Sequence, residues 1–281
     1  MNKDKKYFEG IYFKIQNNNN VIAFIPGCSQ TEAFIQYIDK NTSYYFKYDK
    51  NKYIRKNNTI IIENNILSPE GLSINLKSKD LNIQGNVSFS NLHVLKHHIM
   101  GPFKYLPMQC MHGIISMYHN VNGSLLINNN VIAFNNAIGY SEEDNGTSFP
   151  TNYTWLHYAS PNNKTSIMLA IADVPLGKIS FKGTICAIIN NNQQYILATY
   201  KGAKFLQYSE KQIIIKQGKL SLIVNIFEIN GQTLLAPTSG NMSRDIKENI
   251  CCKGKISFYC NNIPIFKHTC NCISFEYVKE I

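Results

Sequence analysis

Three consecutive acids near the middle of the chain are the first residues that could do chemistry. Glu142, Glu143 and Asp144 lie in the segment Gly139–Pro150, which reads GYSEEDNGTSFP, in a chain of formal net charge +10. Repulsion between neighbouring carboxylates, together with partial removal from water, favours the protonated form of one of them. A protonated carboxyl can serve as a general acid. A solvated turn with three harmless acids is the alternative, and composition alone favours it.

Two histidines precede this segment. His112 and His119 are seven residues apart, and in an extended strand that odd spacing places their side chains on opposite faces, so they need not share a site. A hydrogen-bonded structural role is the alternative for each. Asp173 is a further acid, inside an apolar run where an unpaired carboxylate is costly, so we expect it to have a partner.

The C-terminal segment is rich in cysteine. Structural zinc sites usually present two cysteines two to four residues apart. This segment offers Cys-Cys and Cys-x-Cys instead, in apolar alternating runs around His268, which favours reduced cysteines that fill strand positions as small hydrophobes. We therefore expect no metal, no other cofactor and no disulfide. The cysteines concerned are Cys251, Cys252, Cys260, Cys270 and Cys272.

The composition of the chain indicates where the protein is located in the cell and which classes of partner it can bind. No apolar stretch approaches the roughly 20 residues that span a bilayer, and the N-terminus lacks the apolar core of a signal peptide. We expect a soluble, cytoplasmic protein. Of the 28 basic residues only Arg55 and Arg244 are arginine. Because nucleic-acid recognition depends on the guanidinium group, the charge argues against a nucleic-acid partner and favours a peripheral contact with an anionic lipid surface.

The elements that must position these residues are predicted to be strands. Apolar and aromatic residues alternate over short windows that Asn, Gly and Asp interrupt about every ten residues, a spacing typical of β-sandwiches and barrels. Residues 7–15 and 21–25, on either side of Asn17–Asn20, read as a hairpin. We predict an all-β fold with two lipocalin-like antiparallel β-barrel or sandwich units, residues 1–100 and 101–281, which share a central cleft.

Two regions do not fit this pattern. The segment from His97 to Pro161 reads as the least strand-like part of the chain, and functional residues often lie in such irregular segments. We interpret the acid run as a tight turn that Gly139, Gly146 and Pro150 permit. Residues 243–250 are predicted to form a short helix capped by Ser243.

Several segments together resemble the tocopherol cyclase family over nearly the full length of the chain. The resemblance implies a lipocalin-like all-β architecture, similar in fold to carotenoid hydratases and some fungal cyclases. It also implies acid-initiated ring closure of a prenylated quinol, in which an alkene is protonated and a phenolic oxygen captures the cation. The segments are Phe8–Lys14, Ile22–Gly27, Pro107–Gly113, Gly139–Pro150, Ile171–Pro175 and Met242–Glu248.

The resemblance also suggests roles for individual residues. Glu142 and Asp144 match the family's acidic positions, and His112 would take a phenolic proton or orient an acid. The family has tryptophan at the positions of Ile11 and Asn145 and an acid at the position of Gln109. The expected catalytic residues are Glu142, Asp144, His112 and Asp173, and the expected substrate-binding residues are Tyr140, Phe149, Trp155, His119 and Gln109.

Two functions from different classes remain open at this point. One is a cyclase, or a related isomerase or hydratase, that acts on a prenylated or other lipophilic substrate by proton transfer. The other is a non-catalytic carrier or sensor that binds a lipophilic small molecule. Burial distinguishes them, because buried acids favour the enzyme, whereas exposed acids on an outer turn favour the binding protein.

Overall fold

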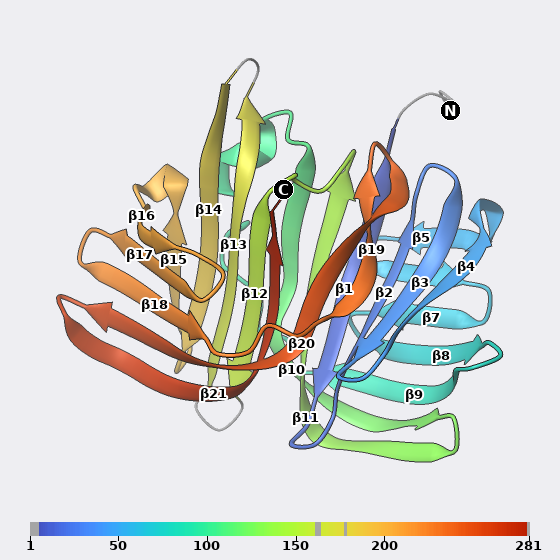
Figure 1. The fold of residues 1–281 in the computed structure, drawn as a ribbon. Helices are drawn as coiled ribbons and strands as arrows, with labels where there is room; N and C mark the ends of the chain where they lie inside the picture. The colour runs from blue at the N-terminus through green and yellow to red at the C-terminus, as the bar shows by residue number, and fades with distance from the viewer. Residues whose placement is uncertain (1–5, 161–163, 177–178, 280–281) are drawn as a thin grey trace. The chain divides into compact units, whose positions relative to one another are not determined.

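The computed structural model describes residues 6–160, 164–176 and 179–279. Their regular structure is almost entirely antiparallel β, which confirms the predicted fold class (Figure 1). Short 3-10 helices also occur, at η1 (Lys50–Lys52), η2 (Gly101–Tyr105) and η3 (Thr199–Lys201). Within the described residues, no helix has the length and apolar character needed to cross a membrane.

The chain divides into two compact units, each built from three segments. Unit 1 comprises residues 1–96, 109–149 and 233–245, and unit 2 comprises residues 97–108, 150–232 and 246–281. Each unit thus combines segments from both sides of the boundary at residue 100 that the sequence suggested.

Unit 1 contains an 11-stranded sheet in which β1 lies between β2 and β11. The expected hairpin of β1 and β2 is confirmed, with Gln16 paired to Val21. The strands, in chain order, are β1 (Phe8–Gln16), β2 (Val21–Cys28), β3 (Glu32–Asp39), β4 (Ser43–Asp49), β5 (Tyr53–Lys56), β6 (Thr59–Ile62), β7 (Asn65–Ser68), β8 (Gly71–Lys77), β9 (Asn82–Ser90), β10 (Cys110–Ile127) and β11 (Asn130–Gly146).

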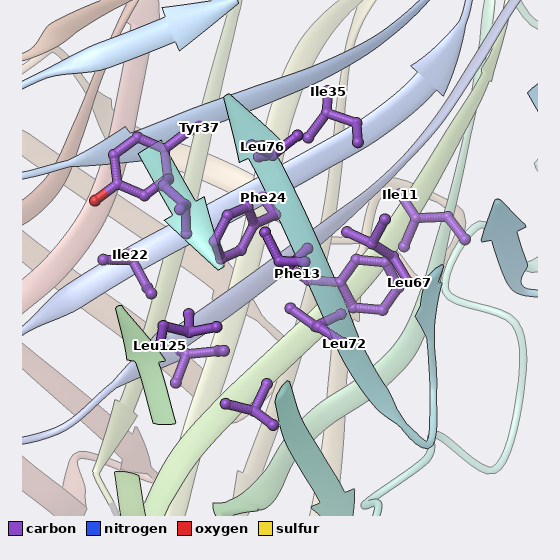
Figure 2. Packing of buried hydrophobic residues seen from close by; sticks show 14 of the residues in the cluster. Ile11, Phe13, Ile22, Phe24, Ile35, Tyr37, Leu67, Leu72, Leu76 and Leu125 are labelled. Carbon is purple, nitrogen blue, oxygen red and sulfur yellow. The ribbon is translucent and has the colours of Figure 1, made fainter. Parts of the chain in front are cut away.

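The strand β1 shows how this sheet separates two buried faces. Ile11 and Phe13 join one apolar core with residues from β2 to β11 (Figure 2). Ile15 belongs to the same core. Because side chains alternate along a strand, the even-numbered residues of β1 point to the opposite face. That second face is also buried, since Tyr12 and Lys14 are largely inaccessible to solvent.

The second large sheet has the order β15-β14-β13-β12-β21-β20-β18-β17-β16, and β19 pairs with β20. Residues such as Leu169, Ile215, Leu222 and Phe258 form its apolar core. The strands are β12 (Tyr153–Ser160), β13 (Thr165–Leu176), β14 (Ile179–Asn190), β15 (Gln193–Ala198), β16 (Lys204–Tyr208), β17 (Gln212–Gln217), β18 (Leu220–Ile226), β19 (Gln232–Thr238), β20 (Asn241–Cys260) and β21 (Ile263–Val278).

The prediction that the middle of the chain is irregular is wrong. Residues 97–161 contain β10, β11 and β12, and the acid run lies inside β11 and not in a tight turn. The cause is burial on both faces of β11, where Tyr140, Ser141 and Glu142 are all buried. A strand with two buried faces loses the alternation of apolar and polar residues by which strands are detected.

The predicted helix at residues 243–250 is also wrong, because these residues belong to β20. Ile246, Glu248 and Ile250 are buried, whereas Lys247 between them is exposed. This alternation is the two-residue period of a strand. The helix prediction rested on Ser243 as a helix cap alone.

One disulfide contradicts the expectation that all cysteines are reduced. Cys251 of β20 and Cys272 of β21 are bonded, because pairing of the two strands brings their Cα atoms within 4.2 Å. Cys252 and Cys270 are free and lie in the apolar core of unit 2, as expected for cysteines that act as small hydrophobes.

Candidate active site

Strand register brings the candidate acids and His112 together in unit 1. Across β10, β11 and β1, His112 pairs with Asp144, which pairs with Gly10. The next row on the same face contains Glu142 opposite Tyr12. Directly paired residues share a face of the sheet, so these side chains lie on the buried face opposite the apolar core.

The side chains form one connected cluster. His112 Nδ1 lies 3.0 Å from Asp144 Oδ1, and His112 Nε2 lies 3.4 Å from Glu142 Oε2. The Tyr140 hydroxyl donates a hydrogen bond to the same Glu142 oxygen. His112 is 9% exposed and Glu142 4% exposed, and Tyr140 is completely buried. A carboxyl group therefore faces each ring nitrogen of His112, and the Glu142 side is buried whereas the Asp144 side chain is 22% exposed.

These contacts determine where protons reside. Burial by itself lowers the pKa of His112, but Asp144 and Glu142 raise it more strongly, to about 9. At neutral pH His112 is therefore an imidazolium, and both of its ring nitrogens can donate.

Two neighbouring groups stay protonated. Burial, followed by the charge of Glu142, raises the pKa of Tyr140, so its phenol remains a hydrogen-bond donor. Burial and Asp144 likewise raise the pKa of Cys110, whose Sγ lies 3.5 Å from Asp144 Oδ1. Since the thiolate is the reactive form of cysteine, Cys110 is unsuited to be a nucleophile.

Aromatic rings occupy the same face of β1. Phe8, Gly10 and Tyr12 alternate along it, and Phe8 and Tyr12 are buried. The Phe8 ring contacts Phe149 edge to face at 5.5 Å between centroids, and Tyr12 contacts Tyr140 in the same way at 6.5 Å. The cluster thus combines proton donors and carboxylates with the π-faces that can stabilise a cation.

Gln109 contributes through its backbone. Its carbonyl accepts a hydrogen bond of 2.9 Å from the Thr147 amide, and Gly146 packs against the same carbonyl. Gln109 therefore fixes the end of β11, two residues beyond Asp144.

His119, expected to bind substrate, lies on the opposite face, as the seven-residue spacing predicts. Its ring lies over Gly139 and 4.4 Å from the Phe89 ring. Among the described residues, neither ring nitrogen has a hydrogen-bond partner, and burial lowers the pKa of His119 to about 3. His119 is thus a neutral residue of the apolar core and is separate from the acid cluster.

Asp173 and Trp155 belong to unit 2. The partner expected for Asp173 is Lys182, whose Nζ lies 2.5 Å from Asp173 Oδ1, and Asn152 donates a second hydrogen bond of 3.0 Å. Burial raises the pKa of Asp173, but these two donors lower it below its usual value. Trp155 is buried and stacks with His157 at 6.5 Å. Neither residue shares a unit with His112.

The acid run divides between two faces of β11, which its interpretation as a turn did not predict. Glu143 points away from Glu142 and Asp144, and its Oε2 lies 2.5 Å from Arg55 Nη2. Arg55 Nη1 also contacts Glu9, at 2.8 Å. A strand interpretation of the run would have predicted this alternation.

Lys14 was not among the predicted site residues either. It is 1% exposed and pairs with Tyr140 across β1 and β11, which places a buried lysine in the row next to Glu142. The available signal was a lysine between apolar neighbours inside a predicted strand.

The cluster could also hold a metal ion. Ligand atoms of His112, Glu142 and Asp144 all lie within 4.8 Å of one another, and imidazole with carboxylate oxygens is a donor set that divalent cations accept. The imidazolium already places a positive charge between the two carboxylates, which favours a proton site. The absence of a metal remains a prediction.

Comparison with known proteins extends the description of the fold. No protein-family model and no curated protein matches the chain in sequence. A candidate AttH protein (NE1406) from Nitrosomonas europaea is similar in structure, with a TM-score of 0.53 and 10% identity over 99% of this chain and 94% of that one. Kievitone hydratase from Nectria haematococca has a TM-score of 0.52 and 12% identity over 97% and 89%. Similarity at these identities shows a shared fold.

Proposed function

We propose that the chain is a tocopherol cyclase-like enzyme that protonates an alkene of a prenylated or other lipophilic substrate and thereby starts cyclisation, isomerisation or hydration. The observation that carries the proposal is the buried cluster in which Asp144, His112 and Glu142 are connected in series and Tyr140 donates to Glu142. The fold shared with a hydratase supports the same reaction class.

The geometry suggests an order of proton transfers. The His112 imidazolium passes its Nε2 proton to Glu142, while Asp144 holds Nδ1. The carboxyl group of Glu142 gives that proton to one alkene carbon, and the alkene electron pair forms the new C–H bond. Tyr140 fixes the Glu142 carboxyl, and the rings of Phe8, Tyr12 and Phe149 stabilise the carbocation.

Capture of the cation completes the reaction. In a prenylated quinol, the phenolic oxygen forms the new C–O bond and its proton passes to His112, so product and substrate are isomers and the enzyme is regenerated. In a hydration, water supplies the oxygen and the proton. Neither step requires an oxidant or a reductant.

A solvent-isotope experiment tests this function. We expect a prenylated hydroquinone incubated with the protein in D2O to yield a chroman with one deuterium at the former alkene carbon, as detected by mass spectrometry and NMR. The E142Q variant should abolish this incorporation, because an amide cannot donate the carboxyl proton.

The control is E143Q, which changes the neighbouring acid on the opposite face. If E142Q and E143Q incorporate deuterium equally, Glu142 is not the acid. If the wild-type protein binds the hydroquinone with no incorporation at all, the alternative of a non-catalytic carrier of lipophilic molecules is supported instead.

A further inference from the structure

The net charge is concentrated in one unit. Unit 2 contains 14 lysines, no arginine and 6 acids, a formal charge of +8, whereas unit 1 contains 14 basic residues and 12 acids, a formal charge of +2. The proton-transfer cluster lies in unit 1 and does not account for this asymmetry.

Strand register places much of this charge on one face of unit 2. Lys204 of β16 pairs with Lys216 of β17, which pairs with Ser221 of β18, which pairs with Tyr259 of β20. These residues therefore form a row on one face. The adjacent row on the other face, Phe205, Ile215, Leu222 and Phe258, packs in the apolar core.

Two more lysines extend the same face. Lys255 is two strand positions from Ser257, which pairs with Lys267 of β21. The Lys267 Nζ lies 5.6 Å from the centroid of the Tyr259 ring, which confirms that both side chains are on this face. We define Lys204, Lys216, Lys255 and Lys267 as the lysine face, and all four are exposed.

The four lysines have no ion-pair partner in the described part of the chain. The rows that contain them hold no Asp or Glu, and the acids of the Glu248–Glu276 row of β20 and β21 are buried, whereas the lysines are exposed. Lys204 and Lys216 are direct cross-strand partners, an arrangement of like charges that destabilises a sheet. An anionic partner would relieve that repulsion.

We propose that the lysine face docks on an anionic phospholipid bilayer. The charge complements acidic headgroups, and each lysine near such a surface adds to the attraction. Leu206, at the β-bulge of β16 beside Lys204, is 64% exposed and supplies an aliphatic contact. The lack of arginine in unit 2 favours headgroups over nucleic acid, which is recognised mainly through guanidinium groups.

Vesicle sedimentation of the full chain tests this surface without reference to catalysis. We expect the wild-type protein to bind phosphatidylcholine vesicles that contain about 30% phosphatidylserine, and to bind pure phosphatidylcholine vesicles much less, because the attraction is electrostatic. Binding should weaken as salt shortens the Debye length, which is about 10 Å at 0.1 M.

A matched pair of variants makes the test specific to the face. The K216Q/K255Q/K267Q variant should bind the anionic vesicles about 10²-fold more weakly, because each lysine near such a surface contributes several-fold in affinity. The K56Q/K77Q/K79Q variant removes the same charge from exposed lysines of unit 1 and should bind nearly as the wild type. Thermal unfolding should be similar for both variants.

Three results would overturn the proposal. One is equal loss of binding in the two triple variants, which would indicate a net-charge effect. Another is no preference of the wild-type protein for anionic over neutral vesicles. The third is tighter binding to a duplex oligonucleotide than to anionic vesicles at the same salt concentration, which would indicate a nucleic-acid partner.

Discussion

Two histidines on one strand have opposite environments in this protein. His112 and His119 both belong to β10 and both are buried, yet the pKa of His112 is raised to about 9 and that of His119 is lowered to about 3. His112 faces Asp144 and Glu142, whereas His119 faces Phe89 and the backbone of Gly139.

The difference shows that burial alone does not determine the charge of a histidine. Burial disfavours the imidazolium at both positions, and only the carboxylates at His112 reverse that effect. One face of the β10–β11 pair is therefore suited to proton transfer, and the other face is suited to packing. Substitutions on each face test this contrast.

The largest effect is expected from the acids of the polar face. E142Q or D144N should reduce turnover of an alkene substrate about 10²–10⁴-fold, because each removes a group from the proton path. Steady-state kinetics would measure this loss, with E143Q as the control. Equal loss in all three variants would show that the acids act on stability and not on the proton path.

A matched leucine pair tests the two histidines directly. H112L should cost about 3–5 kcal/mol in the free energy of unfolding, because it leaves the buried Glu142 and the partly buried Asp144 without their cation. H119L should cost less than about 1.5 kcal/mol, because it exchanges one neutral core side chain for another of similar volume. Urea unfolding measures both, and equal costs would contradict the assigned environments.

Gly139 tests the packing of the apolar face. A Cβ added at Gly139 would lie 2.1 Å from His119 Nε2, so G139A should destabilise the protein by about 1–3 kcal/mol through overpacking. H119A removes the ring that the methyl group meets, so G139A should cost much less in an H119A background. Additive costs in this double-mutant cycle would show that the two residues do not contact.

The two histidines should also give opposite dependences of stability on pH. The raised pKa of His112 contributes stability below its unfolded value of about 6.5, and that contribution is lost as pH rises through about 9. The lowered pKa of His119 contributes above about 6.5 and is lost as pH falls from there towards about 3.

Each histidine can change the free energy of unfolding by at most about 1.4 kcal/mol per pH unit. Unfolding of the wild type, H112L and H119L across pH 5–10 would measure the two slopes. H112L should lose the alkaline dependence and keep the acid one, and the reverse result would exchange the two assignments.

The smallest effect is expected from removal of metal. Because His112 supplies the positive charge between Glu142 and Asp144, dialysis against a chelator should leave the unfolding temperature unchanged. Elemental analysis of the untagged protein should detect no stoichiometric metal. Stoichiometric zinc would show that a metal ion, and not the His112 imidazolium, supplies the positive charge between Glu142 and Asp144.

The sequence by itself determined the all-β class and the identity of the reactive groups. Strands with one exposed face alternate apolar and polar residues, as β17 and β18 do, so the local sequence predicts them. The acid run could be selected because three consecutive acids are unusual in a chain of net charge +10. His112 could be selected, together with the acids, because its segment resembles a known family.

Tertiary structure decided which of these groups meet. Strand pairing joined His112 to Glu142 and Asp144, turned Glu143 towards Arg55, and kept His119 in the core. It also placed Asp173 beside Lys182 and brought Cys251 to Cys272. Register depends on contacts between strands distant in sequence and on which faces are buried, and a one-residue shift exchanges every side chain between faces. That information is absent from local residue patterns.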